Sequence, residues 1–373
     1  MSDITLVLLS AGESSRFELP CKKQWLWIED EPLWLYVLRR FTSFAAFTKT
    51  ILTAHPKEKN LYEKYSNAII VQGGKSRQES ILNALKFVES EYVLISDIAR
   101  VCIQKDVVQR VIAHKDEGAC IVPYIKPVDT IVYRNETIDR NEVKLIQTPQ
   151  LSHTKTLRQA LSQGIEYTDE SSAIKALGGK VVYIEGSPKH RKLTNKEDLA
   201  FLECLKPPLQ IPRTGLGFDV HAFCTGRPLM LCGVEVPYEK GLLGHSDADV
   251  ALHALIDALM GAAGFGDIGE IFPDSDEKYK DIDSKILLQE CVELLQKCGF
   301  VIEHVDLTIM AQAPKLLDFK QTMQQNIATL LHIPKHRVNI KATTTEKLGF
   351  IGRKEGIAAQ AVATLNYYDW SRA

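Results

Sequence analysis

A proline-rich segment near the middle of the chain constrains the fold more than any other feature. Residues 206–212 read Lys-Pro-Pro-Leu-Gln-Ile-Pro. Proline lacks a backbone donor and fixes φ, so the segment cannot continue a helix and favours an extended spacer. The stretches before and after it are each long enough to bury a core of their own. The sequence therefore predicts two domains, residues 1–206 and 213–373, joined by a linker at 207–212.

Composition excludes several classes of function. The net charge is −2, which argues against a general nucleic-acid binder. No apolar run approaches the roughly 20 residues of a membrane-spanning helix, so no membrane partner is expected. The early run Ile4–Leu9 is short and follows an aspartate rather than basic residues, which is typical of a buried strand and not of a signal peptide. We therefore expect a cytoplasmic protein.

The charge differs between the two halves. Residues 1–208 hold 29 Lys and Arg against 26 Asp and Glu, and the remainder holds 16 against 21. A basic half suits anionic small substrates and an acidic half suits metal ions, although neither imbalance decides a function. The eight cysteines are scattered without a CxxC pair. In a reducing compartment they are expected to be small buried hydrophobes rather than disulfides or a thiolate zinc site.

Before the linker, short apolar runs alternate with helical stretches. The expected strands are 4–9, 49–53, 68–71, 92–95, 120–123 and 180–184, and the expected helices are 33–44, 76–89, 106–114 and 195–205. Thr194, with Glu197 three residues on, is the expected cap of the last helix. This alternation predicts an α/β domain, Rossmann-like, with a mostly parallel sheet and helices on both faces. In such sheets, ligands bind at the carboxyl ends of the strands.

After the linker, the pattern predicts a compact α+β domain. Its expected strands are 215–220, 305–311, 338–343 and 357–365, and its expected helices are 246–263, 284–297 and 319–331.

Three loops at expected strand ends carry phosphate-binding chemistry. They are residues 10–17, 73–80 and 96–100. Small residues in such a turn let backbone N–H groups approach a phosphate, and Arg16 and Lys23 add positive charge there. Asp97 ends a strand, where a carboxylate can bind Mg²⁺ together with substrate phosphates. Alternatively, the first loop is an ordinary strand–helix connection, Asp97 caps a helix or turn, and Arg100 forms a surface ion pair. The presence of three such loops at strand ends favours a nucleotide site over these alternatives.

The segment 217–257 carries a metal-ligand pattern. Asp219 and His221 alternate on an expected strand and so point the same way, while His253 lies on the following helix. Three N/O ligands with an open fourth position are typical of catalytic zinc. The expected helix start at His245 and Ser246 would offer free N–H groups to a diphosphate. The alternatives are a hydrogen-bonded Asp-His pair, with Asp249 a helix-dipole partner and Asp257 a solvated side chain.

Residues 3–205 resemble the 2-C-methyl-D-erythritol 4-phosphate cytidylyltransferases. The matching runs include Ser10-Ala11-Gly12, Asp129-Thr130, Thr148-Pro149-Gln150 and Thr168-Asp169-Glu170. The resemblance implies that the first loop wraps CTP and that Gly74 and Ser80 read the cytosine. It implies Mg²⁺ at Asp97, followed by Ala99 and Arg100. The implied catalytic residues are Arg16, Lys23 and Lys192, with Thr130 and Arg140 acting on the substrate phosphate from a partner subunit. The chain departs from the family pattern at Glu13–Phe17, Lys22, Lys75 and His190-Arg191.

Residues 211–366 resemble the 2-C-methyl-D-erythritol 2,4-cyclodiphosphate synthases. The matching runs are 215–221, 245–253, 266–269, 272–274, 311–315 and 342–350. The resemblance implies Zn²⁺ at Asp219, His221 and His253, and a diphosphate at His245 and Ser246. It implies an erythritol site at Asp267 and Gly269, a cytidine site at Ala311, Pro314, Lys315 and Leu316, and a further binding residue at Asp274. Thr343, Thr344 and Glu346 would complete the phosphate and second-metal site, with Phe350 at the substrate, and Arg353 and Phe218 would line a trimer channel. Gln360 stands where the family often has Glu.

The two resemblances together imply a bifunctional enzyme of the non-mevalonate isoprenoid pathway. The first half would join CTP to methylerythritol phosphate, using Mg²⁺ or Mn²⁺. The second would release CMP from the product after a separate kinase has phosphorylated it. The family that the first half resembles forms dimers and the other forms trimers, so a homo-hexamer would satisfy both sets of contacts. Because a kinase acts between the two steps, that kinase is also a candidate partner of the chain. Two other functions for the second half are a zinc phosphohydrolase and a metal-binding scaffold for the transferase.

Overall fold

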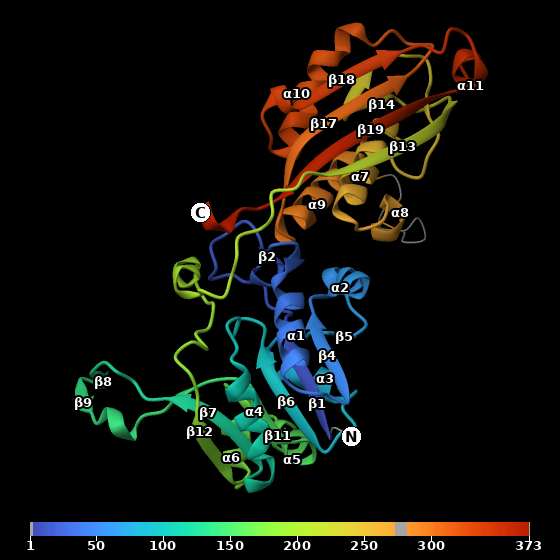
Figure 1. The fold of residues 1–373 in the computed structure, drawn as a ribbon. Helices are drawn as coiled ribbons and strands as arrows, with labels where there is room; N and C mark the ends of the chain where they lie inside the picture. Colours follow the sequence, from blue (N-terminus) through green and yellow to red (C-terminus); the bar gives the residue numbers. More distant parts are fainter. Residues whose placement is uncertain (1–2, 273–281, 373) are drawn as a thin grey trace. The chain divides into compact units, whose positions relative to one another are not determined.

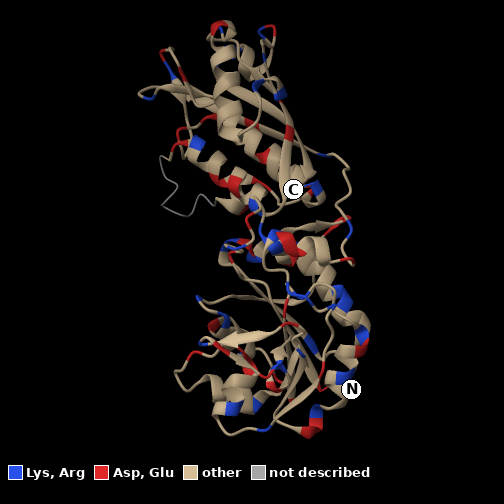
Figure 2. Cartoon of the chain, turned by 90° about the vertical axis from the view of Figure 1, so that its left-hand side faces the viewer, with Lys and Arg blue, Asp and Glu red and all other residues tan. Residues whose placement is uncertain are grey.

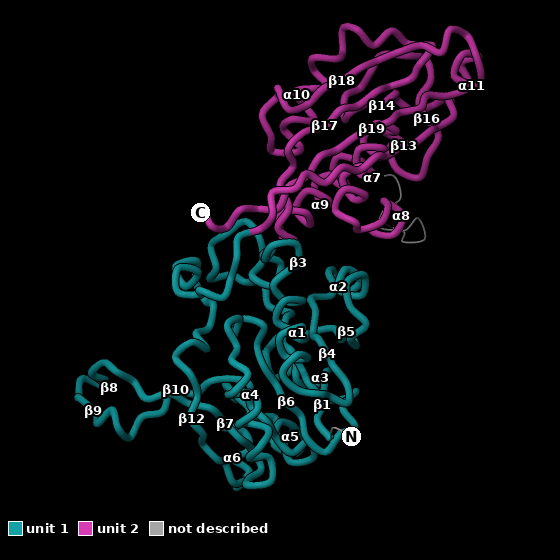
Figure 3. The backbone as a smooth tube through the Cα atoms, viewed as in Figure 1, with its two compact units in different colours: residues 1–207, 373 teal, residues 208–372 magenta. Residues whose placement is uncertain are grey.

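The chain folds into two compact units. The computed structural model describes residues 3–272 and 282–372. One unit comprises residues 1–207 and the other residues 208–372 (Figure 3). The division falls between Pro207 and Pro208, inside the proline-rich segment. Within the described residues, no helix has the length and apolar character to cross a membrane.

The first unit is built on an eight-stranded sheet (Figure 1). Its strands are β1 (Ile4–Leu9), β4 (Lys49–Ala54), β5 (Ile69–Gln72), β6 (Tyr92–Asp97), β7 (Cys120–Ile125), β10 (Leu145–Ile146), β11 (Gln150–His153) and β12 (Val181–Glu185). The order is β10-β7-β11-β6-β1-β4-β5, with β12 beside β7. β1 pairs in parallel with β4 and β6, whereas β11 runs antiparallel between β6 and β7. The sheet is therefore mostly parallel, as expected, and the sequence missed β10 and β11.

Helices cover both faces of this sheet. They are α1 (Leu33–Phe44), α2 (Lys59–Tyr65), α3 (Arg77–Leu85), α4 (Lys105–Ala113), α5 (Thr154–Leu161) and α6 (Glu170–Ala176). Val7 and Ile51 pack in one cluster with α3, α5 and α6. Strand neighbours point to opposite faces, so Leu6 and Leu8, which are also fully buried, belong to the second face. There α4 contacts α1, β7 and β11.

Short hairpins complete the first unit. They are β2 (Trp27–Ile28) with β3 (Glu31–Pro32), and β8 (Ile131–Tyr133) with β9 (Glu136–Ile138). The helix expected at 195–205 is wrong: the structure has a 3-10 helix, Lys196–Phe201. Its cap is Asn195 rather than Thr194, because the Asn195 side chain accepts from the backbone N–H of Asp198, whose carboxylate accepts in turn from the N–H of Asn195.

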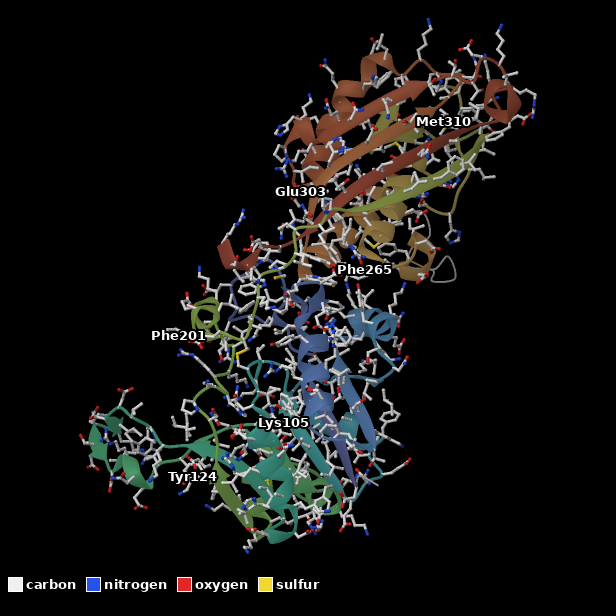
Figure 4. All side chains as sticks on the ribbon, viewed as in Figure 1. Lys105, Tyr124, Phe201, Phe265, Glu303 and Met310 are labelled. Carbon is white, nitrogen blue, oxygen red and sulfur yellow. A yellow bond between two sulfur atoms is a disulfide. The ribbon has the colours of Figure 1, made fainter. Side chains whose placement is uncertain are left out.

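The expectation that no cysteine forms a disulfide is also wrong. Cys102 and Cys204 are bonded, with their Cα atoms 5.6 Å apart (yellow bond near Phe201 in Figure 4). They lie 102 positions apart in the sequence, so their proximity depends on the fold. The other six cysteines are free, and all but Cys224 are buried, as expected of small hydrophobes.

Reduction of this disulfide is expected to destabilise the first unit by about 2–4 kcal/mol, because a bond that closes a loop of about 100 residues restricts the unfolded chain. Urea unfolding of the oxidised protein with and without dithiothreitol measures the difference. In the Cys204→Ser variant, dithiothreitol should no longer change the free energy of unfolding. In Cys224→Ser, which alters a free thiol, dithiothreitol should still lower it. Eight titratable thiols in the unfolded, non-reduced protein would contradict the bond itself.

The second unit is built on a five-stranded sheet in the order β16-β13-β19-β17-β18. Its strands are β13 (Arg213–Cys224), β16 (Gly241–Leu242), β17 (Phe300–Met310), β18 (Val338–Thr343) and β19 (Gly356–Tyr367), with a separate hairpin of β14 (Leu229–Leu231) and β15 (Val234–Val236). The helices are α7 (Val250–Ala263), α8 (Ile268–Ile271), α9 (Ser284–Lys297), α10 (Lys320–Leu331) and α11 (Gly349–Gly352). This is the expected α+β pattern, with α9 and β18 at the predicted bounds.

Two glycines bring helix α7 close to the sheet. A Cβ on Gly217 would lie 1.9 Å from the carbonyl oxygen of Ala254, and one on Gly215 would lie 2.1 Å from that of Ala258. These glycines therefore serve helix–strand packing. That packing places the start of α7, which carries His253, against β13, which carries Asp219 and His221.

Candidate active sites

The loops at the carboxyl ends of β1, β4, β5 and β6 enclose a cavity of about 820 Å³ in the first unit. The predicted residues that line it are Ser10, Ala11, Gly12, Arg16, Lys23, Gly74, Ser80, Asp97, Ala99 and Lys192. They come from loops that are far apart in the sequence but meet at one sheet edge, as expected of a parallel sheet. The loop beginning at Gly73 packs closely on the first loop, since a Cβ on Gly73 would lie 2.2 Å from that of Ala11.

Asp97 lines this cavity and lies between two cations. Lys192 Nζ is 2.6 Å from Asp97 Oδ2, and Arg77 Nε is 3.2 Å from Oδ1. Burial alone would raise the pKa of Asp97, but the charges of Arg77 and Lys192 hold it below its ordinary value. The carboxylate is therefore ionised at neutral pH. This state suits a divalent-cation ligand.

Lys23 is the second lysine at the cavity. Its Nζ donates to the carbonyl oxygens of Leu193 and Thr194, at 3.2 and 3.3 Å. Burial and the nearby charges of Arg16 and Lys192 lower the pKa of Lys23. Five Lys and Arg side chains thus line one cavity against three carboxylates, which favours an anionic ligand; they are Arg16, Lys23, Lys75, Arg77 and Lys192.

Lys22, which departs from the family pattern, supports the first loop. Its Nζ lies 2.6 Å from Glu58 Oε1 and 2.8 Å from Glu13 Oε2, and its side chain is 6% exposed. His55 Nε2 lies 2.9 Å from the other oxygen of Glu13. The lysine thus holds the Glu13 side chain of the phosphate loop and does not itself line the cavity.

Two predicted residues lie elsewhere in the first unit. Thr130 and Arg140 flank the β8–β9 hairpin, which projects from the sheet (Figure 1). Arg140 is exposed and donates to the carbonyl oxygen of Val128. The resemblance assigned both residues to the site of a partner subunit, so their role stays a prediction.

His190 fixes the segment that carries Lys192. Its ring Nε2 accepts from the backbone N–H of Gln104 at 2.7 Å, and its carbonyl oxygen accepts from Arg100. Arg100 is therefore a half-buried donor inside the unit and not a surface ion pair. Among the described residues, Nδ1 of His190 is buried without a hydrogen-bond partner. Burial and the charge of Arg100 lower the pKa of His190 to about 4, so the imidazole is neutral.

This neutral histidine is expected to make the first unit less stable in acid. The unfolded chain takes up a proton near pH 6.5 and the folded chain only near pH 4, so the unfolded state binds more protons between these values. Stability therefore falls as pH drops through that window, by about 2 kcal/mol between pH 7.5 and 5.0 from His190. Urea unfolding of the wild type and of His190→Gln at both pH values measures the contribution of His190 to this loss of stability. An equal pH dependence in the two proteins would contradict it.

In the second unit, Asp219, His221 and His253 form one group of potential metal ligands. Asp219 Oδ2 lies 3.0 Å from His221 Nε2 and 3.1 Å from His253 Nδ1, and the two nitrogens are 3.2 Å apart. Ligands at zinc distances in a tetrahedral site are separated by about 3.3 Å. The three atoms therefore fit one face of such a tetrahedron. Burial would raise the pKa of Asp219, but hydrogen bonds from the two imidazoles hold it well below its usual range.

Two serines orient the ring of His253. Its Nε2 lies 3.1 Å from Ser246 Oγ and 3.0 Å from Ser284 Oγ. Ser284 Oγ donates in turn to Asp247 Oδ1 at 2.5 Å. These bonds hold one ring nitrogen and direct the other, Nδ1, to the metal-ligand group. Ser284 is not among the predicted site residues, because it lies on another helix, α9, and no local sequence pattern marks it.

The expected helix start at Ser246 is wrong. Helix α7 begins at Val250, and Asp249 is its N-cap. The buried Asp249 carboxylate accepts from the N–H groups of Ala251 and Leu252, and also from those of Cys232 and Gly233. Asp249 therefore lies at the N-terminus of the helix, as its alternative role predicted, and the N–H groups of Ala251 and Leu252 at the actual helix start already have a partner. Asp257 is half-buried and accepts from the N–H of Ile268, so it is not a solvated side chain.

The remaining predicted residues of this unit lie in loops. His245 is exposed beside the buried Ser246, and Asp267 caps α8, which contains the exposed Gly269. The loop 311–316 lies against the loop after β18, since Ala311 N–H donates to the carbonyl oxygen of Thr343 at 2.9 Å. Those loops hold Pro314, Lys315, Leu316, Thr344 and Glu346, followed by Phe350 and Arg353. Asp274 lies outside the described residues.

Glu346 is not part of the described metal-ligand group. Its Oε1 accepts from Thr344 Oγ1 at 2.9 Å, and both residues are exposed. Arg353 pairs with Glu355 at 2.7 Å, also at the surface. The roles of these residues stay predictions.

Comparison with known proteins agrees with the division into two sites. Residues 4–205 match the family model of 2-C-methyl-D-erythritol 4-phosphate cytidylyltransferase, and residues 212–366 match the YgbB family model. A protein of Nitratiruptor sp. named bifunctional enzyme IspD/IspF is 66% identical over the full length of both chains. This chain belongs to the bifunctional IspD/IspF family. Its relative of the same name in Aliarcobacter butzleri is 53% identical, again over both full lengths.

The fold of this IspD/IspF member agrees with that of a solved relative. The structure of the bifunctional IspDF from Campylobacter jejuni is 47% identical and covers both chains completely, with a TM-score of 0.87. The chain is accordingly an enzyme with two activities of the non-mevalonate pathway: cytidylyl transfer in the first unit and cyclodiphosphate synthesis in the second. The phosphohydrolase and scaffold alternatives are thereby set aside. The family uses divalent metal ions and CTP.

Proposed function

We propose that the cavity of the first unit binds CTP, with its triphosphate on Arg16, Lys23 and Lys192. The observation that carries this proposal is the convergence of Arg16, Lys23 and Lys192 with the ionised Asp97 on one cavity. A phosphate oxygen of 2-C-methyl-D-erythritol 4-phosphate attacks the α-phosphate of CTP, and diphosphate leaves. The cations stabilise the charge that develops on the leaving group. Mg²⁺ or Mn²⁺ at Asp97 would neutralise phosphate charge.

The other predicted residues complete this site. Ser10, Ala11 and Gly12 present backbone N–H groups to the phosphates, and Gly74 and Ser80 contact the cytosine, with Ala99 beside Asp97. Thr130 and Arg140 contact the methylerythritol phosphate from a partner subunit. Lys192, which pairs with Asp97 in the structure, moves its Nζ to the phosphates when the nucleotide binds.

In the second unit we infer that Asp219, His221 and His253 hold Zn²⁺, which fits their spacing and would polarise the β-phosphate. The 2-phosphate of the substrate attacks this β-phosphate, and CMP leaves as the cyclodiphosphate forms. His245 and Ser246 contact the diphosphate and Thr344 and Thr343 the adjoining phosphates, with Glu346 the ligand of a second divalent cation. Asp267, Gly269 and Asp274 hold the erythritol unit, and Ala311, Pro314, Lys315 and Leu316 the cytidine, with Phe350 and Arg353 nearby.

The first test measures diphosphate release from CTP, ATP, GTP and UTP with methylerythritol phosphate and Mg²⁺. Release with CTP alone is expected. A second assay follows CMP release from the 2-phosphorylated product, with the cyclic diphosphate identified by phosphorus NMR. Failure of CTP to react in the first assay would contradict the first assignment, and linear phosphate products in the second would contradict the cyclisation.

Self-association is part of the proposal. Leu216, Phe218 and Val220 of β13 are 43–61% exposed, and Val128 beside the β8–β9 hairpin is 84% exposed. Apolar groups at these places favour contacts with further copies of the chain. Dimeric contacts through the first unit and trimeric contacts through the second are together satisfied by a hexamer. Sedimentation that finds only monomer would contradict this assembly.

A further inference from the structure

Next to Asp97, the partly exposed Arg77 forms an ion pair with the fully buried Glu170. The guanidinium of Arg77 donates from Nη1 to Glu170 Oε2 at 3.0 Å and from Nη2 to Glu170 Oε1 at 3.1 Å. The remaining Nε–H donates to Asp97 Oδ1 at 3.2 Å. One planar group therefore joins two carboxylates, and each of its three nitrogens donates a hydrogen bond.

Glu170 is itself held rigidly. It is fully buried at the first turn of α6, whose cap is Asp169. Gln150 Nε2 donates to Asp169 Oδ2 at 2.8 Å, and Gln150 Oε1 accepts from the N–H of Ser171 at 3.0 Å. Two family-matching segments, 148–150 and 168–170, thus lock together and anchor the glutamate. Neither segment supplies a residue that lines the cavity.

The two oxygens of Asp97 have unlike partners. Oδ1 faces Arg77, which Glu170 fixes, whereas Oδ2 faces Lys192. Lys192 carries a single flexible ammonium, and its side chain is 41% exposed. The Arg77 contact can therefore persist when the cavity fills, while the Lys192 contact can exchange. A carboxylate held through one oxygen keeps its orientation and still offers the other.

We propose that Arg77 and Glu170 are positioning residues for cytidylyl transfer, which orient Asp97 through Oδ1 so that Oδ2 is available to a divalent cation. This inference rests on the proposed role of Asp97 as a metal ligand. Glu170 also neutralises the guanidinium, so that Arg77 does not draw both oxygens of Asp97 to itself. Without that charge, Arg77 would compete with the cation for Asp97.

The test measures Mn²⁺ binding to the full chain with CTP but without the second substrate, by electron paramagnetic resonance, so no turnover is needed. Glu170→Gln breaks the bidentate pair, and Arg77→Lys keeps a charge but cannot bridge two carboxylates. Each is expected to weaken Mn²⁺ binding about 10-fold or more. The Mg²⁺ concentration for half-maximal velocity should rise in parallel, with a smaller loss of kcat at saturating Mg²⁺.

Ser171→Ala is the matched control. It removes a buried hydroxyl that donates to Asp169, at the same helix start, but does not touch Arg77 or Asp97. Its Mn²⁺ affinity should equal that of the wild type. An equal loss in this control would overturn the inference. Because Arg77 lines the cavity and is partly exposed, Arg77→Lys keeps the proposal testable if the Glu170 variant fails to fold.

Two further proteins separate the remaining outcomes. Asp97→Asn must weaken Mn²⁺ binding; if it does not, the metal assignment fails and the positioning role with it. If only Asp97→Asn acts, the metal assignment stands and the positioning role is overturned. The double variant Arg77→Lys/Glu170→Gln should bind Mn²⁺ no more weakly than the worse single variant, and additive losses would contradict action of Glu170 through Arg77.

Discussion

Replacing Asp219 by asparagine is expected to lower CMP release at least about 100-fold while leaving diphosphate release from CTP unchanged. Asp219 Oδ2 lies within 3.1 Å of both histidine nitrogens in the metal-ligand group, and it supplies the only negative charge among these three ligands. Asparagine keeps the shape but removes that charge, so the site should hold Zn²⁺ poorly. Bound zinc, measured by mass spectrometry of metals, and CMP release check this result.

The control for this variant is Asp257→Asn. Asp257 lies one helical turn beyond His253, is half-buried and accepts a hydrogen bond from the N–H of Ile268. The Asp257→Asn variant also removes one carboxylate charge, from the helix that carries His253, but it leaves the three residues of the metal-ligand group unchanged. Full zinc content and full CMP release in Asp219→Asn would remove Asp219 from the proposed site.

Replacing Lys23 by methionine is expected to lower kcat/KM for diphosphate release from CTP by about 10²–10³. The Nζ of Lys23 is held by the carbonyl oxygens of Leu193 and Thr194, at the edge of the cavity that also contains Arg16 and Lys192. Methionine fills similar space without a charge. The leaving diphosphate would then be stabilised by Arg16 and Lys192 without the charge of Lys23. Steady-state kinetics with CTP and methylerythritol phosphate measure the loss.

The control here is Lys196→Met. It removes an exposed charge close in sequence to Leu193 and Thr194, whose carbonyl oxygens hold Lys23. Lys196 does not line the cavity, so kinetics close to those of the wild type are expected. CMP release by the second unit should be unchanged in both variants. A Lys23→Met enzyme with kcat/KM equal to that of the control would exclude Lys23 from catalysis.

The charged residues of the two units do not by themselves mark either site. Acidic and basic residues are interspersed along both units in the view of Figure 2. The charge difference between the halves of the sequence is therefore a weak guide. The convergence of Arg16, Lys23 and Lys192 on one cavity, together with Asp97, carries the assignment instead.

Much of each site followed from local patterns in the sequence. Strand β1 and helix α1 have the predicted bounds, because a short apolar run and an amphipathic repeat are local properties of the chain. The alternation of Asp219 and His221 along β13 placed both on one face without knowledge of the fold. The sequence runs that resemble the first family identified residues that the structure brings together at the cavity. Those that resemble the second family include the three residues of the metal-ligand group.

Other features depended on contacts between distant segments. The start of α7 was misplaced because Asp249 caps it while also binding the turn after β14, which no local pattern shows. The Cys102–Cys204 bond and the Arg77–Glu170 pair join residues 102 and 93 positions apart. The spacing of apolar residues and glycines along the chain shows which side of a strand or helix is buried. The sequence by itself therefore determined the elements and most ligand candidates. Only the tertiary structure decided which buried charges and thiols meet, because each such pair depends on the packing of the whole unit.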